Sequence, residues 1–195
     1  MQKIMFNDQY SLTQAVLEGR KTQTRRIAYQ EPFKFYCNCG FCTEGKDKGK
    51  LIVFIDSNEI VAKSTYKIGE VVAVAQRYSD IPYIKELHPR INTSEGWGNK
   101  MFVKSNLMPH QIMITNIRCE RLQDISTDDC MKEGIFCSHI DGIDDAYSYD
   151  ATNDSFEKKW WYRTPIEAYK MLSCKLHLHW DNNPLVFVYD FKLVK

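Results

Sequence analysis

The sequence predicts a mainly β fold of the α+β class, in which an antiparallel sheet or small barrel carries peripheral helices. Segments with strand character outnumber those with helical character, and the strongest, residues 185–193, is rich in β-branched and aromatic side chains. The chain shows neither the strand–helix alternation of a parallel α/β fold nor an internal repeat. We therefore expect the strands to pair mostly antiparallel.

The first expected element is a short helix that begins near residue 10. Four residues recur at helical spacing: Tyr10, Thr13, Val16 and Leu17. Gly19 follows at the position where a glycine in the left-handed conformation commonly ends a helix. The helix should therefore end just before a basic run at residues 20–26.

Three strands and a long connection are expected next. Residues 50–55 and 59–63 flank the turn-forming sequence Asp56-Ser57-Asn58, which predicts a hairpin. The continuous apolar character of residues 71–75 predicts a buried strand. Residues 77–100 contain two prolines and predict a long connection, of a kind that is often functional or mobile.

The second half of the chain has clearer start and stop signals. Residues 111–122 predict a long strand whose alternation slips once, which indicates a bulge near Asn116. Ser126 and Asp129 have the pattern of a helix cap, and Gly134 should end this short helix. A second helix should begin at Thr164-Pro165. Its expected apolar stripe comprises Ile166, Tyr169, Leu172, Leu176 and Trp180.

The overall charge is nearly balanced, with 26 Lys and Arg against 25 Asp and Glu among 195 residues. This balance argues against a protein that coats nucleic acid with its whole surface, although a local basic patch can still bind phosphate. No segment approaches the roughly 20 apolar residues of a membrane helix, and the first residues lack the apolar run of a signal peptide. We therefore expect a cytoplasmic protein without membrane partners.

The charges are unevenly distributed along the chain. Residues 20–26 carry four basic side chains and no acid, whereas residues 138–157 carry six acids and no Lys or Arg. We interpret the acidic segment, with its turn-forming residues, as a solvated surface excursion. The basic run is the better candidate for a binding site.

Three of the seven cysteines form a cluster at Cys37, Cys39 and Cys42. Their spacing suits three thiolate ligands of a structural zinc ion. A fourth ligand would come from one of several residues elsewhere: Cys119, Cys130, Cys137, Cys174 or His139. The aromatic residues around the cluster are equally consistent with a loop that packs against the fold. A zinc-stabilised interaction domain is therefore one hypothesis for this chain.

Four separated motifs together resemble the ASCH domain family. They are Val16–Arg26 with its Gly-Arg-Lys-Thr sequence, Tyr66–Glu70, Glu120–Ile135 and Asn183–Phe191. The resemblance implies one PUA-like β-barrel domain over residues 1–195, similar to the longer ASCH proteins of phages and bacterial mobile elements. Compared with the compact members, insertions are expected at about 28–65, 77–108 and 136–164.

The resemblance also implies a function connected with RNA. The family includes proposed RNA-binding modules, a ribonuclease and amidohydrolases that remove the acyl group from N4-acetylcytidine. We expect a pocket that binds RNA or a nucleotide or nucleoside ligand without a required cofactor, and an amidohydrolase is the alternative. By motif position the catalytic residues would be Lys21, Thr24 and Glu133. The doubled base Arg25-Arg26, together with Arg20, suits a phosphate-bearing ligand.

The implied residues can perform amide hydrolysis only under a geometric condition. The reaction needs a nucleophile, a base and an acid for the leaving amine. Neighbouring arginines lower the pKa of Lys21 if the loop brings them close, which increases its neutral fraction. Lys21 and Thr24 have opposite phase in a regular strand, so the chain must turn or bulge between them. The alternative is that Thr22 and Thr24 are ordinary strand residues, that Lys21 and the arginines bind phosphate, and that Glu133 pairs with one of these basic side chains.

Overall fold

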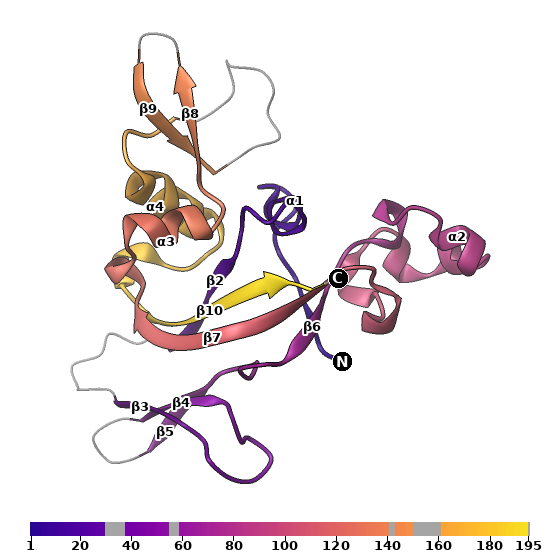
Figure 1. Cartoon of the computed structure of the whole chain (residues 1–195), viewed down its shortest axis with the longest axis horizontal. Coiled ribbons are helices and arrows are strands. Elements are labelled where there is room, and N and C mark those ends of the chain that lie inside the picture. Colours follow the sequence, from indigo (N-terminus) through magenta and orange to yellow (C-terminus); the bar gives the residue numbers. More distant parts are fainter. Residues whose placement is uncertain (30–37, 55–58, 141–142, 150–160, 195) are drawn as a thin grey trace.

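A five-stranded mixed sheet forms the centre of the fold, as the computed structural model of the chain shows (Figure 1). The structure describes residues 1–29, 38–54, 59–140, 143–149 and 161–194. The sheet has the order β1-β6-β7-β10-β2. Its strands are β1 (Lys3–Ile4), β2 (Gln23–Tyr29), β6 (Val71–Val74), β7 (Gln111–Arg121) and β10 (Leu185–Leu193).

The predicted α+β class with a preponderance of β structure is confirmed. β1 pairs parallel with β6, and the other neighbours in this sheet pair antiparallel. Over the residues described, the hydrogen-bonded order runs from β1 to β2 without returning, so the sheet is open where the sequence predicted a small barrel. β1 contributes two residues, which gives that edge few backbone groups for pairing with a further strand.

β7 and β10 are the two long, curved strands of the sheet (Figure 1). Asp190 pairs with Asn116 and Phe191 pairs with Ile114, so Thr115 is the extra residue of a bulge. The bulge predicted near Asn116 is therefore confirmed. It explains the slip in the apolar pattern, because one inserted residue reverses the alternation of the side chains that follow.

A separate three-stranded sheet, in the order β3-β4-β5, packs beside the main sheet. It comprises β3 (Asn38–Phe41), β4 (Leu51–Phe54) and β5 (Ile60–Lys63). The predicted hairpin corresponds to β4 and β5, and its turn at residues 55–58 lies outside the described residues. Leu51 and Val53 of β4 are buried in the same core cluster as Ile112 and Ile114 of β7.

The three helices nearest the main sheet are α1 (Leu12–Leu17), α3 (Thr127–Lys132) and α4 (Pro165–Lys175). Both predicted caps are present. The Ser126 hydroxyl accepts the amide hydrogen of Asp129, and the Thr164 hydroxyl accepts that of Glu167. These caps satisfy amide groups that the first turn of a helix leaves unpaired.

The predicted stripe along the last helix is partly wrong. α4 buries Ala168, Tyr169 and Leu172, but Ile166 is 40% exposed. The helix ends at Lys175, and Trp180 is buried from a separate turn, η8 (Trp180–Asn182). The intervening His177 and His179 have φ angles of 56° and 53°, and this left-handed backbone ends the helical periodicity.

The segment predicted as a long connection is a series of short helical turns that protrudes from the main sheet (Figure 1). Its turns are η1 (Tyr78–Asp80), α2 (Ile84–Leu87), η2 (Ile91–Thr93), η3 (Glu95–Trp97), η4 (Lys100–Phe102) and η5 (Ser105–Leu107). They enclose a second apolar cluster that includes Tyr78, Ile84 and Ile91. A Cβ at Gly96 would lie 2.4 Å from the Tyr78 ring, so the packing requires glycine there.

A hairpin of β8 (Phe136–Ile140) and β9 (Ile143–Ser148) overlaps the first part of the acidic segment. The sequence predicted a surface excursion there and did not indicate these strands. None of the helices in the described ranges has the length and apolar character needed to cross a membrane.

Candidate functional site

A pocket of about 260 Å³ lies at the β2 edge of the main sheet, where α1 and the end of α3 approach it. Lys21, Thr24 and Glu133, the residues implied by the family resemblance, all line it. The complete lining comprises Met5, Phe6, Asn7, Leu12, Lys21, Thr24, Arg25, Arg26, Glu133, Leu176 and Leu178. The pocket therefore combines charged and hydroxyl groups with apolar walls.

Lys21 precedes β2, which begins at Gln23, so the alternation of a regular strand does not apply between Lys21 and Thr24. Gly19 has a φ of 74°, which turns the chain at the end of α1. The amide of Lys21 donates to the Ala15 carbonyl, and the amide of Thr22 donates to the Lys132 carbonyl, each at 2.9 Å. Strand alternation thus does not separate Lys21 from Thr24, and both line one pocket.

Lys21 and Glu133 form a buried ion pair in this pocket. Nζ of Lys21 lies 2.6 Å from Oε2 of Glu133 and 2.7 Å from its backbone carbonyl oxygen. The two side chains are 2% and 3% exposed. Burial lowers the pKa of Lys21, and the Glu133 carboxylate opposes that shift. The arginines at positions 25 and 26 lower it further, in the direction expected from the sequence.

Glu133 is placed by the end of α3, where it is the C-terminal capping residue. Gly134 follows with a φ of 103°, a conformation that side chains rarely adopt. A Cβ at this glycine would lie 3.4 Å from Leu12 and 3.7 Å from the Cβ of Lys21. Glycine therefore allows the chain to reverse directly behind the Lys21–Glu133 pair.

Arg25 holds the second oxygen of the Glu133 carboxylate. Nη1 of Arg25 lies 3.0 Å from Oε1 of Glu133, and Nη2 lies 2.6 Å from Glu120 and 3.1 Å from Asp129. The Arg25 side chain is 0% exposed. Although burial disfavours its charged form, Glu133 and the other partners raise its pKa above the ordinary range. Three carboxylates and the side-chain carbonyl of Gln23 thus engage Arg25.

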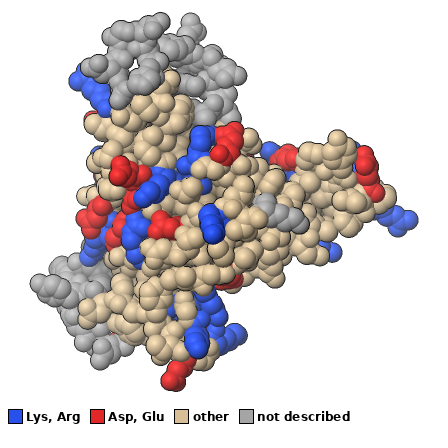
Figure 2. Space-filling view, viewed as in Figure 1, with Lys and Arg blue, Asp and Glu red and all other residues tan. Residues whose placement is uncertain are grey.

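An ion network extends from Arg25 toward the surface. Arg118 contacts Glu120, Asp129 and Asp190, and Lys132 lies 3.1 Å from Asp129. Figure 2 shows acidic and basic side chains interleaved on the side of the molecule where α3 and the ends of β7 and β10 lie. The network fixes Arg25, and through it the orientation of the Glu133 carboxylate.

The three arginines predicted to bind phosphate occupy different environments. Arg25 is buried in the network described above, an arrangement that does not favour phosphate binding. Arg20 pairs with Glu18 at 2.6 Å, outside the pocket lining. Arg26 is exposed at the pocket, and its guanidinium donates to the Met5 carbonyl at 2.6 Å. Arg26 is therefore the arginine best placed to meet a ligand.

Several contributors to the site were not singled out by the sequence. Phe6, Leu176 and Leu178 form apolar walls, and they come from segments distant along the chain. Glu120 and Asp129 lie within a recognised motif, but isolated acids carry no specific signal of their role. The basic run itself was the one indication, because several neighbouring arginines and a lysine are expected to need acidic partners when they are buried.

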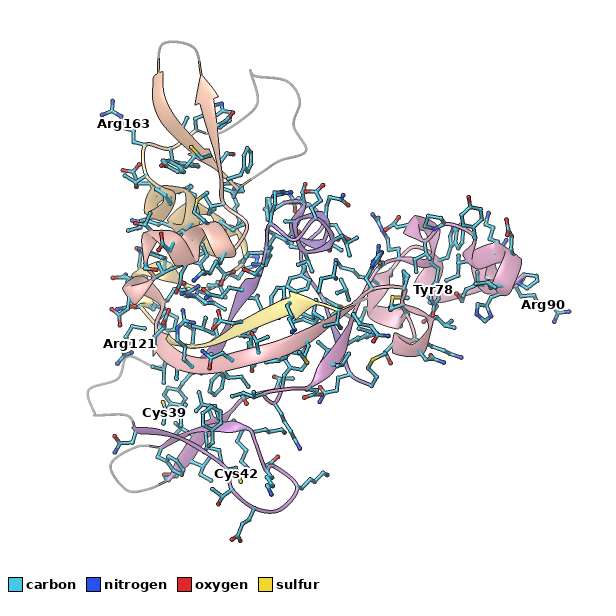
Figure 3. The ribbon with its side chains drawn as sticks, viewed as in Figure 1. Cys39, Cys42, Tyr78, Arg90, Arg121 and Arg163 are labelled. Atoms are coloured by element: carbon cyan, nitrogen blue, oxygen red, sulfur yellow. The ribbon has the colours of Figure 1, made fainter. Side chains whose placement is uncertain are left out.

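The predicted zinc ligands have separate interactions where the structure describes them. Cys39 lies on β3, and its thiol is hydrogen-bonded to the Cys119 thiol, which lowers the pKa of Cys39 to about 7. The Cys42 thiol donates to the Glu44 carbonyl at 3.1 Å. Burial raises the pKa of Cys130 to about 12. In Figure 3, Cys39 and Cys42 lie at opposite ends of β3.

The zinc hypothesis stays a prediction. Cys37 and the side chain of His139 lie outside the described residues. In the parts that are described, no three His, Cys, Asp or Glu side chains are grouped as metal ligands.

A second, more open cavity of about 500 Å³ lies on the protruding segment, where Figure 3 labels Tyr78 and Arg90. It is lined by Tyr78, Leu87, His88, Pro89, Arg90, Ile91, Ser94, Lys104 and Leu107. None of the residues predicted from the family motifs belongs to this lining. The smaller pocket therefore remains the candidate site.

Comparisons with protein-family models, with curated proteins and with solved structures found no match to this chain. The class of the protein is therefore defined by its fold and its pocket. It is an α+β protein with an open five-stranded sheet and a pocket lined by a buried lysine, a glutamate and a threonine.

Proposed function

We propose that this chain is an ASCH-type amidohydrolase that binds a nucleoside-type ligand and cleaves an amide on it. The observation that carries the proposal is the buried Lys21–Glu133 pair in the same pocket as Thr24. Burial without solvent contact is costly for a lysine, and a lysine with a lowered pKa is suited to general base catalysis. A purely structural ion pair does not require a threonine in the lining of the same pocket.

The size and lining of the pocket support a small ligand. A volume of about 260 Å³ lies at the lower end of the range for small-molecule sites. Apolar walls from Phe6, Leu12 and Leu178 suit a flat base or a short acyl group. The engagement of Arg25 by three carboxylates removes one cation that a polyphosphate would need. These features favour a nucleoside over a nucleotide rich in phosphate.

The proposed reaction assigns a distinct role to each residue. Thr24 Oγ1 attacks the amide carbonyl carbon while neutral Lys21 accepts the hydroxyl proton. The C–N bond then breaks, and Lys21 returns that proton to the leaving amine. Water hydrolyses the resulting threonine ester and releases a carboxylic acid. Glu133, held by Arg25, orients the Lys21 amine and compensates its charge when it is protonated.

The decisive experiment is incubation of the purified chain with N4-acetylcytidine, with cytidine followed by chromatography. We expect turnover by the unmodified protein and a loss of about 10²–10⁴-fold in Lys21→Met and Thr24→Val. Thr22→Val is the matched control, since Thr22 precedes β2 and is not part of the pocket lining. It should retain activity within about twofold.

Two outcomes contradict this proposal. One is a folded, unmodified protein that releases no cytidine. The other is turnover that survives in both pocket variants, with circular dichroism showing that all the proteins are folded.

RNA binding without chemistry is a second candidate function, favoured by the exposed Arg26 at the pocket. Affinity for single-stranded RNA should then fall steeply between 50 and 200 mM salt, since phosphate contacts release counterions. Arg26→Ala should weaken binding, whereas Arg90→Ala, on the protruding segment, should not (Figure 3). Binding that is insensitive to salt and to Arg26→Ala would exclude this function.

A further inference from the structure

Two cysteines from different sheets are in contact through their thiols. Cys39 belongs to β3 of the three-stranded sheet, and Cys119 belongs to β7 of the main sheet. A hydrogen bond joins the two thiol groups. The cysteines are far apart in the sequence, so the packing of one sheet against the other creates this contact.

The strand registers independently place each thiol at the junction of the sheets. Cys39 is paired with Val53 and Cys119 is paired with Phe187. Paired residues of neighbouring strands project to the same face of a sheet. Val53 is buried in the main core, so Cys39 lies on the face of its sheet that is turned toward that core. Tyr189, two residues from Phe187, accepts the amide hydrogen of Thr65, which follows β5. The face of the main sheet that carries Phe187, Tyr189 and Cys119 is therefore turned toward the three-stranded sheet.

The environment of the pair allows a reagent to reach it. Cys39 is exposed, and Cys119 is half-buried. β3 is the edge strand of its sheet, bonded to β4 along one side. Because β3 is held on one side only, it can shift slightly to bring the two sulfurs to bonding distance while the centre of the main sheet stays in place.

We propose that Cys39 and Cys119 form a reversible disulfide that joins the three-stranded sheet covalently to the main sheet. The oxidant is a hydroperoxide. The Cys39 thiolate attacks the peroxide oxygen, the O–O bond breaks, and Cys39 becomes a sulfenic acid as water or an alcohol leaves. The Cys119 thiolate then attacks the Cys39 sulfur, the S–O bond breaks and water leaves after protonation. Two thiols lose two electrons, and the peroxide gains them.

This disulfide is separate from the proposed catalytic chemistry. Arg118 and Glu120, on either side of Cys119, project into the ion network with Asp129 and Arg25. Because side chains alternate along a strand, Cys119 projects to the other face of β7. The crosslink therefore limits separation of the two sheets and uses none of Lys21, Thr24 and Glu133.

The test uses the full chain, reduced and then treated with hydrogen peroxide at increasing doses. We expect loss of two of the seven thiols, a mass decrease of about 2 Da and a crosslink between the peptides that contain Cys39 and Cys119. Dithiothreitol should restore both thiols. Cys39→Ser and Cys119→Ser should each abolish the crosslink. Cys42→Ser and Cys174→Ser are the matched controls and should retain it.

Three results would overturn the proposal. The first is oxidation of the exposed Cys174 at doses that produce no link between residues 39 and 119. The second is a link to Cys119 that persists in Cys39→Ser and so arises from another cysteine. The third is bound zinc, detected by metal analysis of the untreated protein, that protects both thiols from peroxide.

Discussion

Oε2 of Glu133 lies 2.6 Å from the ammonium of Lys21, while its Oε1 lies 3.0 Å from the guanidinium of Arg25. One carboxylate thus contacts two buried cations, and Arg25 has Glu120 and Asp129 as further partners. The pair gives the pocket a fixed donor, a fixed acceptor and little conformational freedom. Removing the carboxylate would leave both cations without this partner in a low-dielectric environment.

Glu133→Gln should therefore lower the free energy of unfolding by about 3 kcal/mol. Glu18→Gln is the matched control, because Glu18 pairs with Arg20 at the surface, and it should cost less than about 1 kcal/mol. Urea titrations of both variants and the unmodified chain measure the difference. Equal losses would mean that the buried pair contributes no more than a surface pair.

The lowered pKa of Lys21 predicts a pH dependence of stability. In the unfolded chain a lysine titrates at about 10.4, whereas in the fold burial lowers the pKa of Lys21. Between these two values the unfolded state binds more protons, so the contribution of Lys21 to stability rises with pH. Below the folded value both states are protonated, and that contribution is constant.

Buried tyrosines with raised pKa values also make stability depend on pH in this range. Comparison with Lys21→Met isolates the effect of Lys21, because these tyrosines are present in both proteins. As the pH rises toward about 10, stability should shift in favour of the unmodified chain relative to the variant. Guanidinium titrations at a series of pH values provide the measurement. A difference that stays constant up to that pH would contradict the lowered pKa.

Gly134→Ala should destabilise the chain by about 1–3 kcal/mol, because its φ of 103° is unfavourable for alanine and the added Cβ approaches Leu12. Gly19→Ala provides the comparison. Its φ is 74°, and a Cβ there would have no atom within 4 Å, so the cost should be about 1 kcal/mol. Thermal and urea unfolding test the order, and a larger loss at Gly19 would refute it.

Tyr169→Phe should leave stability unchanged or raise it by about 1 kcal/mol. The Tyr169 hydroxyl is buried and has no hydrogen-bond partner among the described residues, and an unsatisfied buried group is unfavourable. Tyr189→Phe is the counterpart, since the Tyr189 hydroxyl accepts the Thr65 amide hydrogen at 2.9 Å, and it should cost about 1 kcal/mol. A marked loss in Tyr169→Phe would show that its hydroxyl is needed.

Features governed by local sequence were predictable. The cap at Ser126 depends on an amide three residues later, and the bulge near Asn116 depends on a slip in an alternating pattern. Each of these signals lies within a single short segment of the chain. The family motifs likewise indicated Lys21, Thr24 and Glu133, which all line the pocket.

Features that depend on long-range packing were not predictable from pattern alone. Glu120 and Asp129 partner Arg25 because β2, β7 and α3 converge, and no local spacing encodes that meeting. The contact of Cys39 with Cys119 likewise depends on how two sheets pack. The same holds for the open sheet, which differs from the expected barrel over the described residues, because the order in which strands pair depends on tertiary packing.

β6 lies between two apolar clusters, and successive side chains from residue 72 to residue 75 point alternately into one cluster and the other. Val72 and Val74 belong to the main core, whereas Ala73 and, just beyond the strand, Ala75 belong to the cluster of the protruding segment. Enlarging Ala73 would crowd the outer cluster, and truncating Val72 would leave a void in the inner one. An engineer can therefore address the two clusters separately, through neighbouring positions of a single strand.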